Sequence, residues 1–208
     1  MSLPDQPTFV GLITSRPIHE VVEQYIFSGP AYVFRNKPAA EGFLRSHLTS
    51  QLPIKEEGIR IVGSAKTGFS LDPDSFPAPF SPASDIDVVV VDQDLFDSIW
   101  FTVLEWHYPR KGSHLGEPDR GWMVDRRRAV YWGAIRPNEI RYRGVSFPAV
   151  LRPLRDISVR WFNAFQSLSH HPQFVRRRTS GILYRTWEHA FLYHVDCLRR
   201  VRDLVQSS

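Results

Sequence analysis

One stretch of this chain constrains the fold more than any other. Ile86–Val91 reads IDVVVV, a run of β-branched residues that is interrupted only by Asp87. Such a run is typical of a strand that is buried on both faces. Residues 58–64 (GIRIVGS) form a second, shorter apolar run that ends in Gly63 and Ser64. We therefore expect two central strands, and with them a sheet that helices must cover.

The segment between the two runs reads as a loop. The 20 residues between Ser64 and Asp85 contain four prolines, at positions 73, 77, 79 and 82. Proline lacks the backbone N–H that helices and strands need, so regular structure cannot extend far here. We expect a proline-rich insertion over residues 72–83, with a short helical turn near Gly68.

Apolar periodicity predicts helices along the rest of the chain. The first is expected at 15–27 with Ser15 as its cap, and a last strand is expected at 180–184. Residues 140–151 favour an edge strand or an irregular connection. The other expected helices cover 37–51, 92–107, 117–134, 156–168 and 186–204.

These elements predict an α+β fold with a small mixed sheet covered by helices and with additional N- and C-terminal helices. We expect a single domain over residues 1–208. Its parts are a helical N-terminal support (1–57), the motif-bearing strands and helix (58–110), and a basic, mostly helical half (111–208).

The composition argues against several classes of protein: disordered, disulfide-bonded, cysteine-rich zinc-binding and membrane-spanning proteins. The apolar fraction of 42% and the charged fraction of 23% are near globular averages, which argues against disorder. The single cysteine, Cys197, excludes intramolecular disulfides and cysteine-rich zinc sites. No apolar run is long enough to span a bilayer, and the N-terminus has neither a basic nor an apolar region. We expect a cytoplasmic protein that is not inserted in a membrane.

The charge changes sign along the chain. Residues 1–109 hold 7 Lys and Arg against 14 Asp and Glu, whereas residues 110–208 hold 19 against 8. Arginine supplies 22 of the 26 cations, and its planar guanidinium suits phosphate recognition. This favours RNA or another polyanion as a partner; solvated, mutually compensating halves are the alternative. The residues proposed for polyanion binding are Arg126, Arg127, Arg128, Arg176, Arg177 and Arg178.

Asp85 and Asp87 are the main candidates for chemistry. Residues two apart in a strand point to the same side, so the two carboxylates should lie together. Two such carboxylates repel each other unless a cation lies between them, and Mg²⁺ prefers oxygen ligands of this kind. Gly63 would allow a phosphate to approach the backbone. The candidate nucleotide-binding residues are Gly63, Ser64, Lys66 and Ser84.

Residues 59–91 resemble the nucleotidyltransferase superfamily, which has the polymerase β-like fold. The features that match are a hydrophobic strand, the Gly63-Ser64 pair, a spacer, and an Asp-hydrophobic-Asp strand. The resemblance implies that Gly63 and Ser64 bind the triphosphate. It also implies that Asp85 and Asp87 are the catalytic residues and hold the metal, Mg²⁺ or alternatively Mn²⁺.

The sequence departs from this family in two ways. The spacer between Ser64 and Asp85 is longer than the family usually shows. The third carboxylate that many members carry on a later strand has no clear counterpart, although Glu139, Asp156 and Glu188 are available in the basic half.

Two functions therefore stay open. The first is a magnesium-dependent transfer of a nucleoside monophosphate from a nucleoside triphosphate, with ATP favoured, to RNA, a protein or a small molecule. The second is a catalytically inactive relative that binds a nucleotide or nucleic acid as a regulator or partner subunit, for example in a toxin or defence system.

Overall fold

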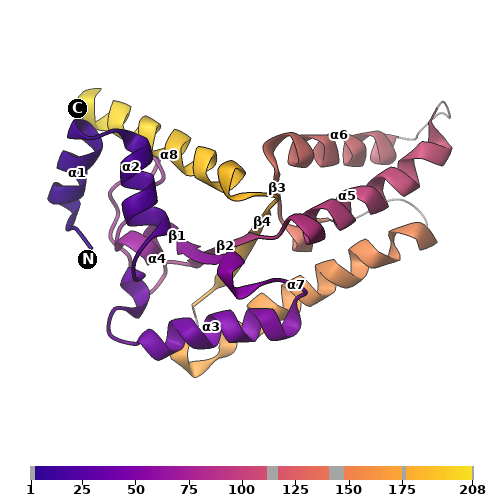
Figure 1. Ribbon diagram of the computed structural model, residues 1–208, viewed down its shortest axis with the longest axis horizontal. Helices are drawn as coiled ribbons and strands as arrows, with labels where there is room; N and C mark the ends of the chain where they lie inside the picture. The colour runs from indigo at the N-terminus through magenta and orange to yellow at the C-terminus, as the bar shows by residue number, and fades with distance from the viewer. Residues whose placement is uncertain (1–2, 112–116, 141–147, 175–176, 208) are drawn as a thin grey trace.

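The computed structural model describes residues 3–111, 117–140, 148–174 and 177–207. Over these residues the chain forms an α+β fold in which a four-stranded mixed sheet lies between two groups of helices (Figure 1). The strand order is β1-β2-β4-β3. Strand β2 pairs antiparallel with β1 and parallel with β4, and β3 pairs antiparallel with β4. The strands are β1 (Ile59–Val62), β2 (Ile86–Val91), β3 (Ala134–Ile135) and β4 (Thr179–Tyr184).

Most of the predicted helices are confirmed, with shifted ends. Gly68, with a left-handed φ of 92°, ends the short helical turn expected beside it. Asp92 caps the helix that follows β2, because its side chain accepts a hydrogen bond from the N–H of Leu95. The helices are α1 (Gln6–Ser15), α2 (Ile18–Val21), α3 (Pro38–Gln51), α4 (Gly63–Thr67), α5 (Gln93–His107), α6 (Glu117–Trp132), α7 (Arg152–His170) and α8 (Trp187–Ser207).

The N-terminal prediction was wrong in its boundaries. Ser15 ends helix α1 instead of capping a helix, and the cap of α1 is Asp5, whose carboxylate accepts from the N–H of Thr8 at 3.0 Å. The chain then forms α2 and a π-helical turn, η1 (Val22–Phe27). The apolar stripe expected for one helix over 15–27 is therefore divided between these two pieces.

The basic half also differs from its prediction. Helix α6 ends at Trp132, and Gly133 adopts a left-handed φ of 57°, which allows the chain to turn into the two-residue strand β3. The expected edge strand over 140–151 falls largely on 141–147, which lie outside the described residues. Its end, Ala149–Leu151, forms a 3-10 turn.

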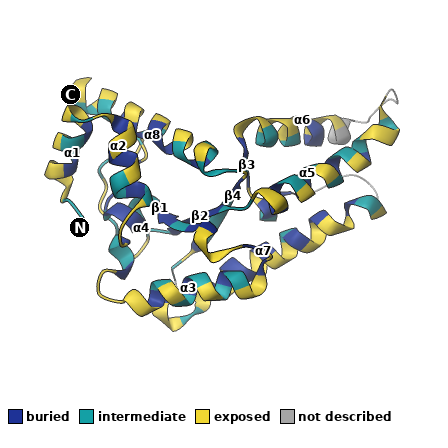
Figure 2. Ribbon diagram, viewed as in Figure 1, coloured by how far each residue is buried: buried dark blue, intermediate teal, exposed yellow. Residues whose placement is uncertain are grey.

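The alternation of β2 divides the core into two clusters. Ile86, Val88 and Val90 pack on one face, face A, with buried residues of α3, α5 and α7. Val89 packs on the other face, face B, with α1, α2, η1 and α8. Strand β2 lies inside the sheet and contributes buried residues to both clusters, so the expectation of a central strand at 86–91 is confirmed; Figure 2 shows its burial. The expectation of a second central strand at 58–64 was wrong, because β1 lies at the edge of the described sheet, paired with β2, and Gly63 and Ser64 begin helix α4.

Strand β4 alternates in the same way. Leu183 belongs to the core of face A, and a Cβ on Gly181 would overlap the ring of Phe165 from α7. Ile182 and Tyr184 pack on face B. Ser180 is two residues before Ile182 and therefore also lies on face B. Asp87, two residues before Val89 on β2, lies on the same face.

In the described ranges, no helix combines the length and the apolar character needed to cross a bilayer.

A buried histidine in the face B core predicts a pH-dependent stability. His194 is 8% exposed, packs edge-on against Phe27 and has no described hydrogen-bond partner at Nε2. Burial lowers the pKa of His194 to about 4, against 6.5 when exposed. As pH falls from 6.5 to 4, His194 becomes protonated in the unfolded chain but stays neutral in the folded chain. The stability therefore falls over this window, by about 3 kcal/mol in all.

Urea unfolding at pH 7.5 and pH 4.5 measures this loss. Between these pH values, we expect the free energy of unfolding to fall by about 2 kcal/mol less in His194→Leu than in the wild type. The contribution of the carboxylates is the same in both proteins and cancels in this difference. Equal losses in the two proteins would show that His194 does not carry the effect.

Candidate functional site

The pairing of β1 with β2 brings the Gly63-Ser64 turn to Asp87. Val62, the last residue of β1, lies opposite Asp87. Gly63 then adopts a left-handed φ of 64°, and a Cβ at this position would lie 3.2 Å from Oδ2 of Asp87. A side chain here would therefore crowd the carboxylate as well as strain the backbone. Ser64 follows directly, in the first turn of α4, and is partly exposed.

The two aspartates lie on the same face of the sheet. Asp85 immediately precedes β2, and Asp87 is the second residue of β2. Burial raises the pKa of Asp87; a hydrogen bond from Ser180 opposes this shift, and the negative charge of Asp85 adds to it.

Strand β4 supplies the nearest neighbours of both aspartates. The register places Ser180 beside Asp87, and the Ser180 hydroxyl donates a hydrogen bond of 2.9 Å to Oδ1 of Asp87. One position before β4, Arg178 approaches Oδ2 of Asp85 at 3.6 Å. Sequence reasoning missed Ser180. Aligning residues 180–184 with 86–91 as a parallel pair would have found it.

The third carboxylate is not found in the described residues. Strand β4 runs beside the aspartates but has no acidic residue. Glu139 instead forms an ion pair with Arg136, Asp156 is exposed on α7, and Glu188 is exposed at the start of α8. No cluster of three His, Cys, Asp or Glu side chains suited to a metal occurs in the described ranges.

The donor set nevertheless fits a magnesium ion bound together with a phosphate. Magnesium usually takes one or two protein carboxylates and completes its shell with water and substrate phosphates. Asp85 and Asp87 provide two carboxylates two residues apart, at the start of β2. Because Gly63 has no side chain, it leaves room next to Oδ2 of Asp87.

Lys66 has a different role from the one predicted. It is 3% exposed, and its ammonium donates hydrogen bonds to the backbone carbonyls of Ser28, Gly29 and Pro30, at 2.6, 2.6 and 3.2 Å. Burial lowers the pKa of Lys66 to about 8. These hydrogen bonds connect α4 to the turn after η1. Because all three N–H groups of the ammonium are used in them, Lys66 does not bind a phosphate.

Ser84 belongs to a turn that closes the proline-rich loop. Its hydroxyl accepts a hydrogen bond from the N–H of Ser81 at 2.9 Å, and its own N–H donates to the carbonyl of Ser81. Arg177 donates to the carbonyls of both serines and lies over the ring of Phe80, 4.6 Å from its centroid. Ser84 and Arg177 thus position the backbone that leads into Asp85.

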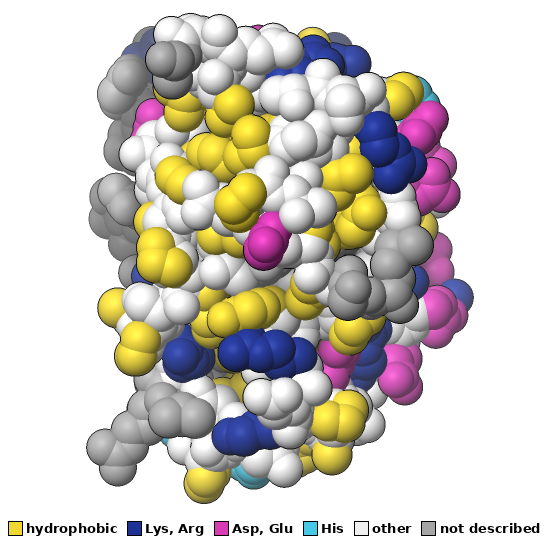
Figure 3. All heavy atoms as spheres, turned by 90° about the vertical axis from the view of Figure 1, so that its left-hand side faces the viewer, with side chains coloured by type: hydrophobic (Ala, Val, Ile, Leu, Met, Phe, Trp, Pro, Cys, Tyr) yellow, Lys and Arg dark blue, Asp and Glu magenta, His cyan; other side chains and the backbone are white. Residues whose placement is uncertain are grey.

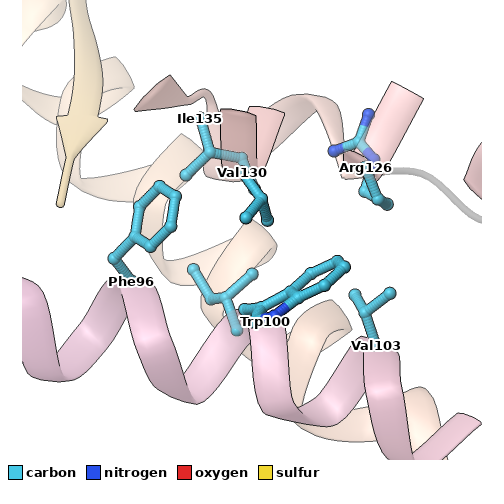
Figure 4. Close-up of a pocket in the computed structure, with 7 residues that line it drawn as sticks. Phe96, Trp100, Val103, Arg126, Val130 and Ile135 are labelled. Carbon is cyan, nitrogen blue, oxygen red and sulfur yellow. The ribbon is translucent and has the colours of Figure 1, made fainter. Parts of the chain in front are cut away.

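The two arginine runs proposed for polyanion binding differ in surroundings. Arg176 lies outside the described residues, whereas Arg178 is exposed beside Asp85. Arg127 and Arg128 are exposed on α6. Arg126 is half-buried, and burial lowers its pKa. It lines a small apolar cavity with Phe96, Trp100 and Val103 of α5 and with Val130 and Ile135 (Figure 4).

A larger groove lies away from the aspartates. It has a volume of about 740 Å³ and is lined by the N-terminal segment, the start of α3 and the proline-rich loop, including Tyr32, Arg35, Phe69 and Pro79. Figure 3 shows the side of the molecule that is on the left in Figure 1, where hydrophobic, basic and acidic side chains are interspersed. The residues that line the groove include none of Gly63, Ser64, Asp85 and Asp87.

No family model matches the chain, and no match was found among the curated proteins or the solved structures.

The position of Lys66 predicts a loss of stability rather than of phosphate contacts. Lys66→Met keeps the length of the side chain but leaves three carbonyls without their donor, which should cost about 2 kcal/mol in urea unfolding. The matched control Lys55→Met, at an exposed position, should cost less than about 0.5 kcal/mol. A Lys66→Met protein of wild-type stability would contradict this assignment.

Proposed function

We propose that this chain is a magnesium-dependent nucleotidyltransferase that transfers a nucleoside monophosphate from a nucleoside triphosphate, with ATP favoured, to an acceptor. The observation that carries the proposal is the contact between the Gly63-Ser64 turn and Asp87. Alternation along the extended chain places the carboxylates of the Asp-x-Asp pair on the same face. Two segments that the sequence resemblance linked are thus neighbours in space.

Each residue of the site has a distinct role in this proposal. Asp85 and Asp87 hold the metal, whose chemistry when bound is to neutralise the negative charge that develops on the phosphates. Gly63 lets the triphosphate approach the backbone, and the Ser64 hydroxyl donates to a phosphate oxygen. Ser180 orients Asp87 through the bond to Oδ1, so that Oδ2 stays available.

The reaction is a displacement at the α-phosphorus. An acceptor hydroxyl attacks, a new P–O bond forms, the bond to the β-phosphate breaks, and pyrophosphate leaves with the negative charge. The hydroxyl proton passes to solvent, because the described residues offer no third carboxylate as a general base. RNA, a protein side chain and a small molecule are all acceptors compatible with this chemistry.

One observation favours the second candidate function, a catalytically inactive relative that binds a nucleotide or nucleic acid as a regulator. The strand beside Asp87 presents the neutral Ser180 where a further carboxylate could complete a metal site. A site with two carboxylates can bind a nucleotide with its metal yet transfer slowly.

Nucleotide binding can be tested by thermal melting with each of the four nucleoside triphosphates, with and without Mg²⁺. At ten times the dissociation constant, the bound nucleotide should stabilise the folded chain by about 1.4 kcal/mol and raise the midpoint by about 4 °C. The rise should require Mg²⁺ and should vanish in Asp85→Ala/Asp87→Ala. A rise that persists in the double variant would place the nucleotide elsewhere, and no rise at all would reject both nucleotide functions.

Asp87→Asn separates the enzyme from the regulator. Asparagine keeps the shape and the hydrogen bond from Ser180 but removes the charge that holds the metal. If the chain is an enzyme, release of pyrophosphate should fall by at least about 100-fold. A wild type that binds a triphosphate but forms no product with RNA, protein or small-molecule acceptors would support the regulator instead.

The salt dependence of binding identifies the class of acceptor. If the acceptor is RNA held by the basic half, its affinity should fall steeply with ionic strength; with six phosphate contacts, the drop between 50 and 200 mM salt is about 1,000-fold. Filter binding at several salt concentrations measures the slope. A small-molecule or protein acceptor should show a far shallower slope.

A further inference from the structure

Charged side chains of opposite sign meet at one end of face B. Asp87 belongs to β2 and Asp85 directly precedes this strand; Arg178, which directly precedes the neighbouring strand β4, lies beside Asp85. On the strand after that, Arg136 directly follows Ile135, the last residue of β3, and keeps an extended backbone. Ala134 packs on face B and Ile135 on face A, so alternation directs Arg136 to face B, where the aspartates are.

Arg178 is held only loosely by Asp85. The two charged groups are 3.6 Å apart, and the side chain of Arg178 is 75% exposed. An exposed pair of this kind contributes little to stability, so it breaks at small cost when a stronger partner for either group arrives. Arg177, by contrast, is fixed by the two serine carbonyls. Arg178 can therefore move to another partner, whereas Arg177 is held in place.

Arg136 lies on the far side of β4 from the aspartates, next to Ile182 in the register and two residues along β4 from Ser180. Its positive charge acts on Asp87. Its partner Glu139 is 3.5 Å away, and both side chains are more than half exposed, so the guanidinium is free to turn toward a ligand on face B. Sequence reasoning missed Arg136, because it stands alone and outside both arginine runs.

Building on the proposed function, we propose that Arg136 and Arg178 form the phosphate-binding side of the site and that Arg178 is the counter-ion of Asp85 until a divalent cation replaces it. The ligand class is a di- or triphosphate chain that lies across the strand ends, from the aspartates to the arginines. Guanidinium groups suit this role because they donate two parallel hydrogen bonds to phosphate oxygens.

The arrangement couples the two ligands. Without a cation, Arg178 is shared between Asp85 and any phosphate that arrives. Once a cation binds Asp85, the guanidinium is released and becomes available to the phosphate chain. Removing Arg178 should therefore act in opposite directions on cation binding and on phosphate binding, which loss of a merely structural residue would not do.

Titration of Mn²⁺ in the absence of phosphate, followed by the electron paramagnetic resonance of free Mn²⁺, tests the counter-ion role. Arg178→Gln should bind Mn²⁺ about two- to fivefold more tightly than the wild type, because the competing cation is gone. Arg178→Lys keeps the charge and should stay near the wild-type affinity. The exposed Arg160→Gln on α7 is the matched control and should change nothing.

Calorimetric titration of pyrophosphate in the presence of Mg²⁺ tests the phosphate role. Arg178→Gln and Arg136→Gln should each weaken pyrophosphate binding at least about fivefold. Arg136→Gln should leave the Mn²⁺ affinity within about twofold of the wild type. ATP in place of pyrophosphate should show the same two losses if the phosphate chain is that of a nucleotide.

The outcomes separate this proposal from the proposed function. If Arg178→Gln weakens or does not change Mn²⁺ binding, or if neither arginine affects pyrophosphate, the present proposal is overturned even where nucleotidyl transfer is found. If both arginine effects appear but no acceptor yields product, the binding site stands and the transferase function fails. A wild type that binds neither Mn²⁺ nor pyrophosphate overturns both.

Discussion

The parallel pairing of β2 with β4 is the constraint on which the rest of the structure depends. It joins residues about ninety positions apart, and its register sets Asp87 beside Ser180 and brings Arg178 to Asp85. Because β2 is buried on both faces, sliding β4 by one residue would exchange its two faces and drive Ser180 into the core. The hydrophobic clusters therefore fix the positions of the polar groups at the strand end.

The sequence predicted the elements whose signals are local, and it failed where distant contacts decide. Ile86–Val91 was predicted with its observed bounds because its apolar run is continuous. Helix α1 is not among the predicted helices, although Asp5 and Pro7 fit the start of a helix, because apolar periodicity favours the stripe after Ser15. For Lys66, nearness in sequence to Gly63-Ser64 favoured a phosphate contact, whereas the carbonyls that hold it come from a turn almost forty residues earlier.

Acidic and basic residues that are far apart in the sequence lie close together at the candidate site. The first half, rich in acidic residues, contributes the aspartates of β2, and the basic half contributes arginines through β3 and β4. Since β4 inserts between β2 and β3, charges that are far apart in sequence become neighbours across single strands. Charge pattern alone could indicate a polyanion partner, but only the strand order and register place Arg178 beside Asp85 and Arg136 on the same face, next to Ile182. The exposed Arg127 and Arg128 lie on α6 instead.

The proline-rich loop closes on itself before the chain reaches Asp85. The N–H of Ser70 donates to the carbonyl of Ala78, and the N–H of Phe80 donates to the carbonyl of Gly68, both at 2.8 Å. Arg177 then fastens the chain between Ser81 and Ser84. Leu71 and Phe76 pack into the face B core, whereas the tip between them exposes Asp72, Asp74 and Ser75, and these backbone bonds lie between that tip and Asp85 in the chain. A dye, an affinity tag or a longer natural insertion can be accommodated at this tip while Asp85 and Asp87 keep their places, which makes it the natural attachment point for a reporter of ligand binding.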